Sequence, residues 1–241
     1  MAGKSSKTAT KSRAHARAWK QLTLDDARTP CGRGGWRPGA GRPRGRTKVE
    51  HGRRVRFPER YPQHVTLRVH RDVDGSIRKR HLAQIIRGAI RASHKHHFRV
   101  IEFNVLTNHV HLIVEARGAA GLARGMQGLN VRIARRLNRA LRRRGTFFAE
   151  RYHTRALKTP REVRHAIHYV LRNHQIHLAR AGVDVSWFWI DPFSSAPWFR
   201  AWARPIYARD PDIMELRAHA PPTAPPTVWL LTHGWQRGGL L

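Results

Sequence analysis

Positive charge is the feature that most limits what this chain can fold into. Its 241 residues include 47 Lys and Arg against 15 Asp and Glu, a formal net charge of +32. Self-repulsion on this scale opposes a compact fold unless a polyanion neutralises it. Nucleic acid is the favoured partner, because neutralised phosphates release counterions and that release drives binding. An anionic membrane surface is the alternative, but the sequence shows neither an amphipathic basic helix nor an apolar anchor.

The cysteine content and the apolar patterning of the sequence indicate in which cellular compartment the protein works. The single Cys31 excludes a disulfide framework and a zinc site built on cysteines. The basic N-terminus lacks the apolar stretch of a secretory signal, and no window approaches the roughly 20 apolar residues that span a bilayer. We therefore expect a soluble protein without membrane contact, located in the cytoplasm and associated with the nucleoid.

The beginning of the chain is strongly basic. Residues 1–60 contain 17 Lys and Arg against 4 Asp and Glu, a net of +13, with few large apolar residues. This composition predicts a disordered, DNA-binding arm. Within it, residues 34–46 (GGWRPGAGRPRGR) are AT-hook-like, and Arg42 and Arg44 would enter a narrow A·T minor groove. A generic basic arm that contacts phosphates without regard to sequence is the alternative.

From about residue 61 the pattern becomes that of a folded domain. Periodicity predicts four extended segments and three helices: strands 63–71, 98–106, 109–116 and 147–157, and helices 78–97, 121–145 and 159–182. The order β-α-β-β-α-β-α predicts an α+β fold, a ferredoxin-like antiparallel sheet with helices packed on it. Residues 61–182 would form this domain, and residues 183–241 a Trp- and Pro-rich extension partly packed on it.

The last predicted helix has the clearest boundaries. Thr159 is placed to cap its start, Pro160 occupies the first helical position, and Glu162 follows three residues after the cap. This is the pattern of a capping box. Gly182 is placed to end the helix.

Two histidines stand one residue apart in the stretch LTNHVHLIVEA, residues 106–116. With 17 histidines in 241 residues, chance alone gives about one His-x-His, so the bare pattern is weak. Alternate residues of a strand share a face, so His109 and His111 point to one side and the apolar residues between and after them to the other. Such a pair can chelate one divalent ion. A solvated polar sheet face is the alternative.

The last predicted helix adds a second chemical group. Tyr169 and Asn173 are four residues apart and share one helix face, and His165 extends that stripe by one turn. A phenol close to an amide oxygen would place a nucleophile beside a metal ligand. The alternative is that Tyr169 is a half-buried packing residue.

Together these motifs carry a family resemblance. NHVHLIVE, followed about fifty residues later by HAIHYVLRN, resembles the IS200-like single-tyrosine (Y1) transposases of the HUH nuclease superfamily, and most closely the REP-associated tyrosine transposases. His109 and His111 match the His-hydrophobe-His motif, Tyr169 stands where the nucleophile is expected, and Asn173 where the REP-associated branch carries Asn. The resemblance covers roughly residues 61–200.

The resemblance implies an enzyme: a metal-dependent, single-stranded DNA endonuclease and strand-transferase acting at hairpins or palindromic repeats. His109, His111 and Asn173 would hold one Mg²⁺ or Mn²⁺. Tyr169 would attack the scissile phosphate and form a 5′-phosphotyrosine intermediate. His165 is a candidate acceptor for the phenol proton. Either a monomer or a homodimer is compatible with the family.

Further DNA contacts are expected from the predicted basic helix 121–145 and from the aromatic extension. The helix arginines would grip a DNA stem, although their spread over several faces also fits simple solvation. The arginines in question are Arg124, Arg132, Arg135, Arg136 and Arg139. Trp187, Phe188 and Trp189 would either stack on unpaired bases or pack into the core.

Two other functions fit parts of the pattern. A catalytically inactive nucleic-acid-binding protein on the same fold is the main alternative. RNA-recognition modules of this layout place aromatic residues on the central strands, and the predicted strands here carry histidines instead. Replication initiators and relaxases usually have a third histidine or a second tyrosine in the catalytic helix, whereas Tyr169 is the only tyrosine of helix 159–182.

Overall fold

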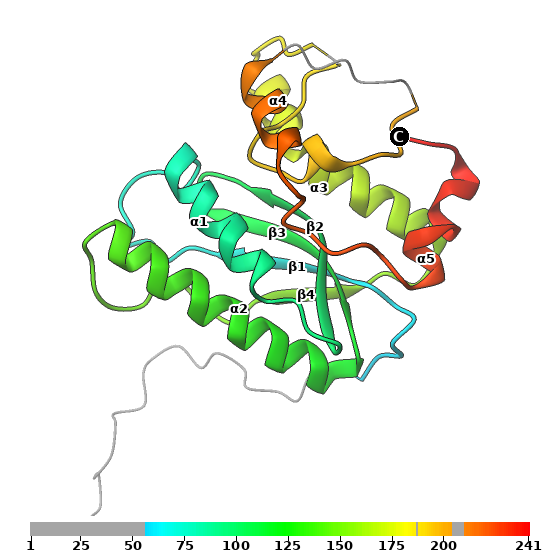
Figure 1. The fold of residues 1–241 in the computed structure, drawn as a ribbon, viewed down its shortest axis with the longest axis horizontal. Helices are drawn as coiled ribbons and strands as arrows, with labels where there is room; N and C mark the ends of the chain where they lie inside the picture. The colour runs from blue at the N-terminus through cyan, green and yellow to red at the C-terminus, as the bar shows by residue number, and fades with distance from the viewer. Residues whose placement is uncertain (1–55, 187, 204–209) are drawn as a thin grey trace, which may run out of the picture. The chain divides into compact units, whose positions relative to one another are not determined.

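A computed structural model describes residues 56–186, 188–203 and 210–241 (Figure 1). The predicted AT-hook-like segment 34–46, with Arg42 and Arg44, lies outside the described residues, as does Trp187. None of the helices in the described part combines the length and the apolar character that crossing a bilayer demands.

The described residues form one four-stranded antiparallel sheet with helices packed on it. Its strands are β1 (Gln63–Arg68), β2 (Phe98–Val105), β3 (His109–Ala116) and β4 (His153–Ala156). They lie in the order β2-β3-β1-β4, and every neighbouring pair is antiparallel. β2 and β3 are joined by a tight turn, whereas the other connections pass through α1 (Arg80–Arg91) and α2 (Gly118–Ala140). This is the predicted ferredoxin-like topology, and the α+β prediction is confirmed.

The two faces of the sheet support two separate cores, because alternate strand residues point to opposite sides. Val65 and Leu112 face α1 and α2, where they join the larger apolar cluster. Ile113 faces the other way and packs with Val163 of α3 (Pro160–Arg180) and with Trp235 near the end of the chain. Figure 1 shows α3 and the C-terminal segments on the side of the sheet away from α2.

The C-terminal extension packs around α3 in short elements. These are a 3₁₀ turn (Ala196–Trp198), α4 (Pro211–Ala218), α5 (Trp229–Thr232) and a second 3₁₀ turn (Gly234–Gly238). Between them the chain runs along the outer edge of β2, where the Ala224 amide donates to the Val100 carbonyl at 2.9 Å. The division into domains at residue 182 stays a prediction.

Several predicted element ends differ from the structure. α1 ends at Arg91 rather than near residue 97, because the Ser93 hydroxyl donates back to the Ala89 carbonyl and the chain then turns into β2. α2 ends at Ala140 rather than 145, because Arg142 adopts the left-handed region (φ 51°). The fourth strand spans only residues 153–156. The capping box at the start of α3 is present as predicted, with both reciprocal bonds.

Two glycines of α2 give a matched test of this packing. A Cβ on Gly125 would overlap the buried ring of Phe98, whereas a Cβ on Gly128 would meet only the tip of Arg132 at 3.9 Å. We expect Gly125→Ala to lower the free energy of unfolding by about 1–3 kcal/mol through overpacking. Gly128→Ala should raise it by up to about 1 kcal/mol through helix propensity. Urea unfolding monitored by circular dichroism checks both, and equal effects would contradict the described packing.

Candidate active site

The paired histidines lie on the face of β3 that α3 covers. Their ring centroids are 4.7 Å apart, and the Nε2 atoms of His109 and His111 are separated by 3.1 Å. His109 Nδ1 is 2.7 Å from the side-chain oxygen of Asn108, which only accepts, so the His109 proton resides on Nδ1. His109 therefore directs a free nitrogen lone pair toward His111, as ligands of one shared ion do.

Tyr169 extends from α3 into contact with these histidines. Its ring centroid lies 5.2 Å from that of His111 and 5.8 Å from that of His64, both in edge-to-face geometry. The Tyr169 side chain remains 40% exposed. The phenol is thus positioned by two imidazole rings and still accessible to a large substrate, which a fully packed core tyrosine would not be.

Asn173 lies one turn beyond Tyr169 and is buried, with 1% of its surface exposed. Its side-chain oxygen, Oδ1, has no hydrogen-bond partner among the described residues. Leaving a buried acceptor unmatched costs about 1–3 kcal/mol. A buried amide oxygen of this kind fits a ligand that is bound in the working protein.

His64 and Thr66 belong to the same site and were missed in the sequence. His64 Nε2 lies 3.2 Å from His111 Nδ1, and the Thr66 hydroxyl lies 3.1 Å from the same nitrogen. Both contacts arise because β1 pairs with β3 in a register that sets Thr66 opposite His111. The alternation of β1 places His64 and Thr66 on one face, but the sequence does not reveal which strand pairs with it.

Burial keeps these imidazoles neutral. It lowers the pKa of His64 to about 4, with a smaller contribution from the charge of Arg155. It lowers the pKa of His111 to about 3, helped by the positive forms of His64, His109 and His177. The pKa of His109 is lowered for the same main reason. Neutral imidazole is the form that binds metal ions.

The two ends of the α3 stripe differ in their relation to the site. His177, one turn beyond Asn173, lies close enough for its charge to act on His109 and His111. His165, the predicted proton acceptor, is exposed. Within the described residues no hydrogen bond or ring contact joins His165 to Tyr169, so its role stays a prediction without a supporting contact.

The atoms offered by His109, His111 and Asn173 are of the types that bind divalent metal ions. The described part of the chain has no group of three or more His, Cys, Asp or Glu side chains arranged to hold a metal. The predicted set differs because it contains two such residues, His109 and His111, and an amide oxygen from Asn173. Two neutral imidazoles and one amide oxygen suit Mn²⁺ or Mg²⁺, and such a set also accepts zinc.

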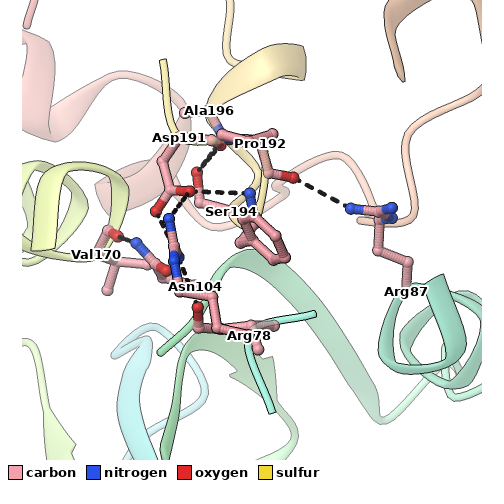
Figure 2. A network of polar contacts seen from close by, with 10 residues as sticks. Arg78, Arg87, Asn104, Val170, Asp191, Pro192, Ser194 and Ala196 are labelled. Atoms are coloured by element: carbon pink, nitrogen blue, oxygen red, sulfur yellow. Dashed lines mark hydrogen bonds and ion pairs between the residues drawn. The ribbon is translucent and has the colours of Figure 1, made fainter. Parts of the chain in front are cut away.

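A buried polar network fixes α3 against the sheet (Figure 2). The Asn104 amide donates to the Val170 carbonyl at 2.8 Å, next to Tyr169 in the chain. Asn104 lies directly opposite His111 in the pairing of β2 with β3. The extension is held alongside by the ion pair of Arg78 with Asp191, at 2.6 Å.

The α2 arginines that are predicted to contact DNA lie on the opposite face of the sheet. They line a cavity of about 780 Å³ along α2. Its arginines are Arg124, Arg132, Arg135, Arg136 and Arg139. None of them forms an ion pair with an acidic side chain in the described part of the chain. In the extension Phe188 is 55% exposed, which excludes core packing for this ring.

The neutral imidazoles predict that the fold is acid-sensitive. In the folded protein the pKa values of His64 and His111 are about 4 and about 3, below the ordinary value of 6.5. At a pH between the folded and the ordinary pKa, the unfolded chain therefore binds more protons than the folded one. The contribution of these two histidines to the free energy of unfolding is therefore fully present above about pH 6.5 and is lost as the pH falls. Between pH 7.5 and 5.0, His64→Gln should lose less stability than the wild type, by on the order of 1 kcal/mol. Urea unfolding at the two pH values measures this, and identical losses would contradict burial of His64.

Comparison with known proteins places these residues in a family. The model of the IS200-like transposases matches residues 64–173. No curated protein matches the chain. A solved structure described as a REP-associated tyrosine transposase bound to a REP hairpin is similar, with a TM-score of 0.47 and 17% identity over 77% of this chain and 97% of that one. Residues 64–173, which include both histidines, Tyr169 and Asn173, thus match the IS200-like transposases, and the resemblance predicted from these motifs is confirmed.

Proposed function

We propose that the protein cleaves and rejoins single-stranded DNA at hairpins or palindromic repeats through a covalent bond to Tyr169. The observation that carries this proposal is the contact of the Tyr169 ring with His111, whose Nε2 faces that of His109. The tyrosine is exposed, and the imidazoles beside it are neutral. This combination offers a nucleophile next to a pair of metal ligands.

His109, His111 and Asn173 would hold the divalent ion, Mg²⁺ or Mn²⁺. When bound, it would polarise the scissile phosphate and offset the charge that develops during attack. Asn108 and Thr66, which contact the Nδ1 atoms of the two histidines, orient their rings for this purpose. The unmatched Oδ1 of Asn173 would gain the partner that it lacks among the described residues.

The covalent step exchanges one phosphate ester for another. The Tyr169 oxygen forms a bond to phosphorus as the phenol loses its proton, and the bond from phosphorus to the 3′ oxygen breaks. The departing oxygen takes a proton and becomes a free 3′-hydroxyl, while the other fragment stays on the protein as a 5′-phosphotyrosine. Attack by a different 3′-hydroxyl reverses the step and joins new ends, so no ATP is needed.

The α2 arginines would bind the paired stem of such a hairpin. Five guanidinium groups gather along one cavity on a chain with a net charge of +32. Arginine and lysine contacts to phosphates supply most of the sequence-independent affinity for DNA. This cavity would therefore position the substrate, while the chemistry takes place on the other face of the sheet.

The covalent intermediate gives the decisive test. Incubation of the full chain with a hairpin-bearing single-stranded oligonucleotide and Mn²⁺ should give a protein–DNA adduct on denaturing electrophoresis. Tyr169→Phe should abolish the adduct, because it removes the attacking oxygen and leaves the ring contacts. His109→Ala should also abolish it while DNA affinity stays within about twofold, since the histidine contributes to chemistry rather than to phosphate binding.

His165→Ala changes the same helix one turn away and leaves the contacts of Tyr169 in place, so it tests the predicted proton acceptor. Adduct formation at the wild-type rate would exclude that role for His165. An adduct that persists in Tyr169→Phe would move the nucleophile elsewhere. A wild-type protein that binds the hairpin without any adduct would favour the alternative, a catalytically inactive nucleic-acid-binding protein.

The stem-binding role of α2 predicts a change in salt dependence. Arg135→Ala and Arg139→Ala should each weaken hairpin binding and make the slope of log K against log salt shallower by about 0.9 for each lost phosphate contact. Arg71→Ala removes the same charge from an exposed side chain that already pairs with Asp72, and it should leave the slope unchanged. Fluorescence anisotropy between 50 and 200 mM salt, a range of about fourfold, measures the slopes. Equal slopes in all variants would exclude α2 from the interface.

A further inference from the structure

A second cavity opens on the same sheet face as the catalytic residues. It has a volume of about 570 Å³. Its walls come from Ile101 and Glu102 of β2, from Ile167 of α3 and from the C-terminal extension. Its size is in the range of cavities that bind small organic groups, roughly 300–1,000 Å³. None of the predicted metal or nucleophile residues lines it.

The carboxyl group of Glu102 is left half-satisfied in this cavity. The Ser195 hydroxyl donates to its Oε2 atom. That bond is the one hydrogen bond of the Glu102 side chain among the described residues, so its other oxygen, Oε1, remains available. Burial raises the pKa of Glu102 to about 8, so the group is mainly a neutral acid at pH 7. Glu102 is partly exposed at the cavity wall, so its free oxygen can share a hydrogen bond with a ligand.

Three aromatic residues contribute to the remaining walls. Trp198, Phe199 and Trp235 all line the cavity. The two indole N–H groups are already used, because Trp198 donates to the His219 carbonyl and Trp235 to the Leu231 carbonyl, each at 3.0 Å. Trp198 and Phe199 are partly exposed and offer ring surface rather than polar atoms, whereas Trp235 is buried and supports the ring of Phe199. Stacking of a base on such rings contributes about 1–3 kcal/mol.

Arg200 places a positive charge beside these apolar walls. Its side chain lines the cavity and is exposed. In the described part of the chain it makes neither a hydrogen bond nor an ion pair, so its donors are free for a ligand. Arginine is the residue best suited to bind a phosphate, because its guanidinium group can donate two parallel hydrogen bonds.

We propose that this cavity binds one unpaired nucleotide of the DNA substrate, with its base against the rings of Trp198 and Phe199 and beside Glu102, and its phosphate on Arg200. The inference rests on the proposed function, because it assumes that single-stranded DNA is the substrate. It adds a site that reads the unpaired flank of a hairpin, separate from the paired stem on α2 and from the residues that cut.

Two oligonucleotides test the inference with the full chain: a hairpin with a single-stranded flank on each side, and the same hairpin without flanks. Anisotropy titrations in EDTA prevent cleavage. Glu102→Leu and Arg200→Ala should each weaken binding of the flanked hairpin at least about fivefold, the lower limit for one stacked base. Both should leave the blunt hairpin unchanged. Glu102→Gln keeps the size, one donor and one acceptor, and should bind both oligonucleotides like the wild type.

Abasic substitution along the flanks locates the contact. One abasic position should reproduce the loss in the wild type and add nothing further in Glu102→Leu. Arg71→Ala controls for the loss of one positive charge. If the thermal unfolding midpoint of Glu102→Leu is below that of the wild type, the inference is tested by the Arg200→Ala titration and by the abasic scan of the wild type.

Wild-type affinity of both variants for the flanked hairpin would overturn the inference, and so would equal weakening for both oligonucleotides. The proposed function is judged separately by the Tyr169 adduct. A flank preference that depends on Glu102 and Arg200 without any adduct would retain this cavity and refute the chemistry.

Discussion

One buried amide connects the helix that carries the nucleophile to the strands that carry the imidazoles. Asn104 donates to the carbonyl of Val170 from a position directly opposite His111, and the residue is fully buried. Its own oxygen has no hydrogen-bond partner among the described residues, a cost that an apolar side chain would avoid. The amide instead aligns α3 with the sheet, because a directional hydrogen bond to one helix carbonyl fixes the rotation of α3 about its axis and its position along that axis. Apolar contacts alone would allow Tyr169 to slide relative to His111.

The sheet separates the two activities that we propose. Its α1 and α2 face carries the basic cavity, and its α3 face carries Tyr169 and the histidines. A DNA molecule that contacts both must pass around one edge. The β2 edge is covered, because Ala224 in the extension bonds to Val100. Within the described residues the β4 edge is exposed, including Arg155, so our proposal implies that the DNA passes this edge between α2 and Tyr169.

Local periodicity was enough to predict the topology but not the complete site. The alternation of strands and the spacing of helices gave the element order, and the capping signals gave the start of α3. His64 was missed because its importance depends on the pairing of β1 with β3, which no local pattern reveals. Strand alternation would place Glu102 on the face of Val100, but a bulge between Val100 and Glu102 shifts it to the face of Ile113, which α3 covers. His165 shares the helical stripe of Tyr169, but the sequence could not show which end of that stripe meets the sheet.

The charge that opposes folding also prepares the site. Burial is the main cause that lowers the pKa of His109, and the positive charges of His177 and Arg68 add to it. Arg155 acts in the same direction on His64. In an acidic protein the neighbouring carboxylates would favour protonated imidazoles, which cannot bind a cation. Here burial keeps the imidazoles neutral, and Arg68 and Arg155 add to its effect on His109 and His64. In the function that we propose, the same excess of positive charge would also attract the phosphates of the DNA.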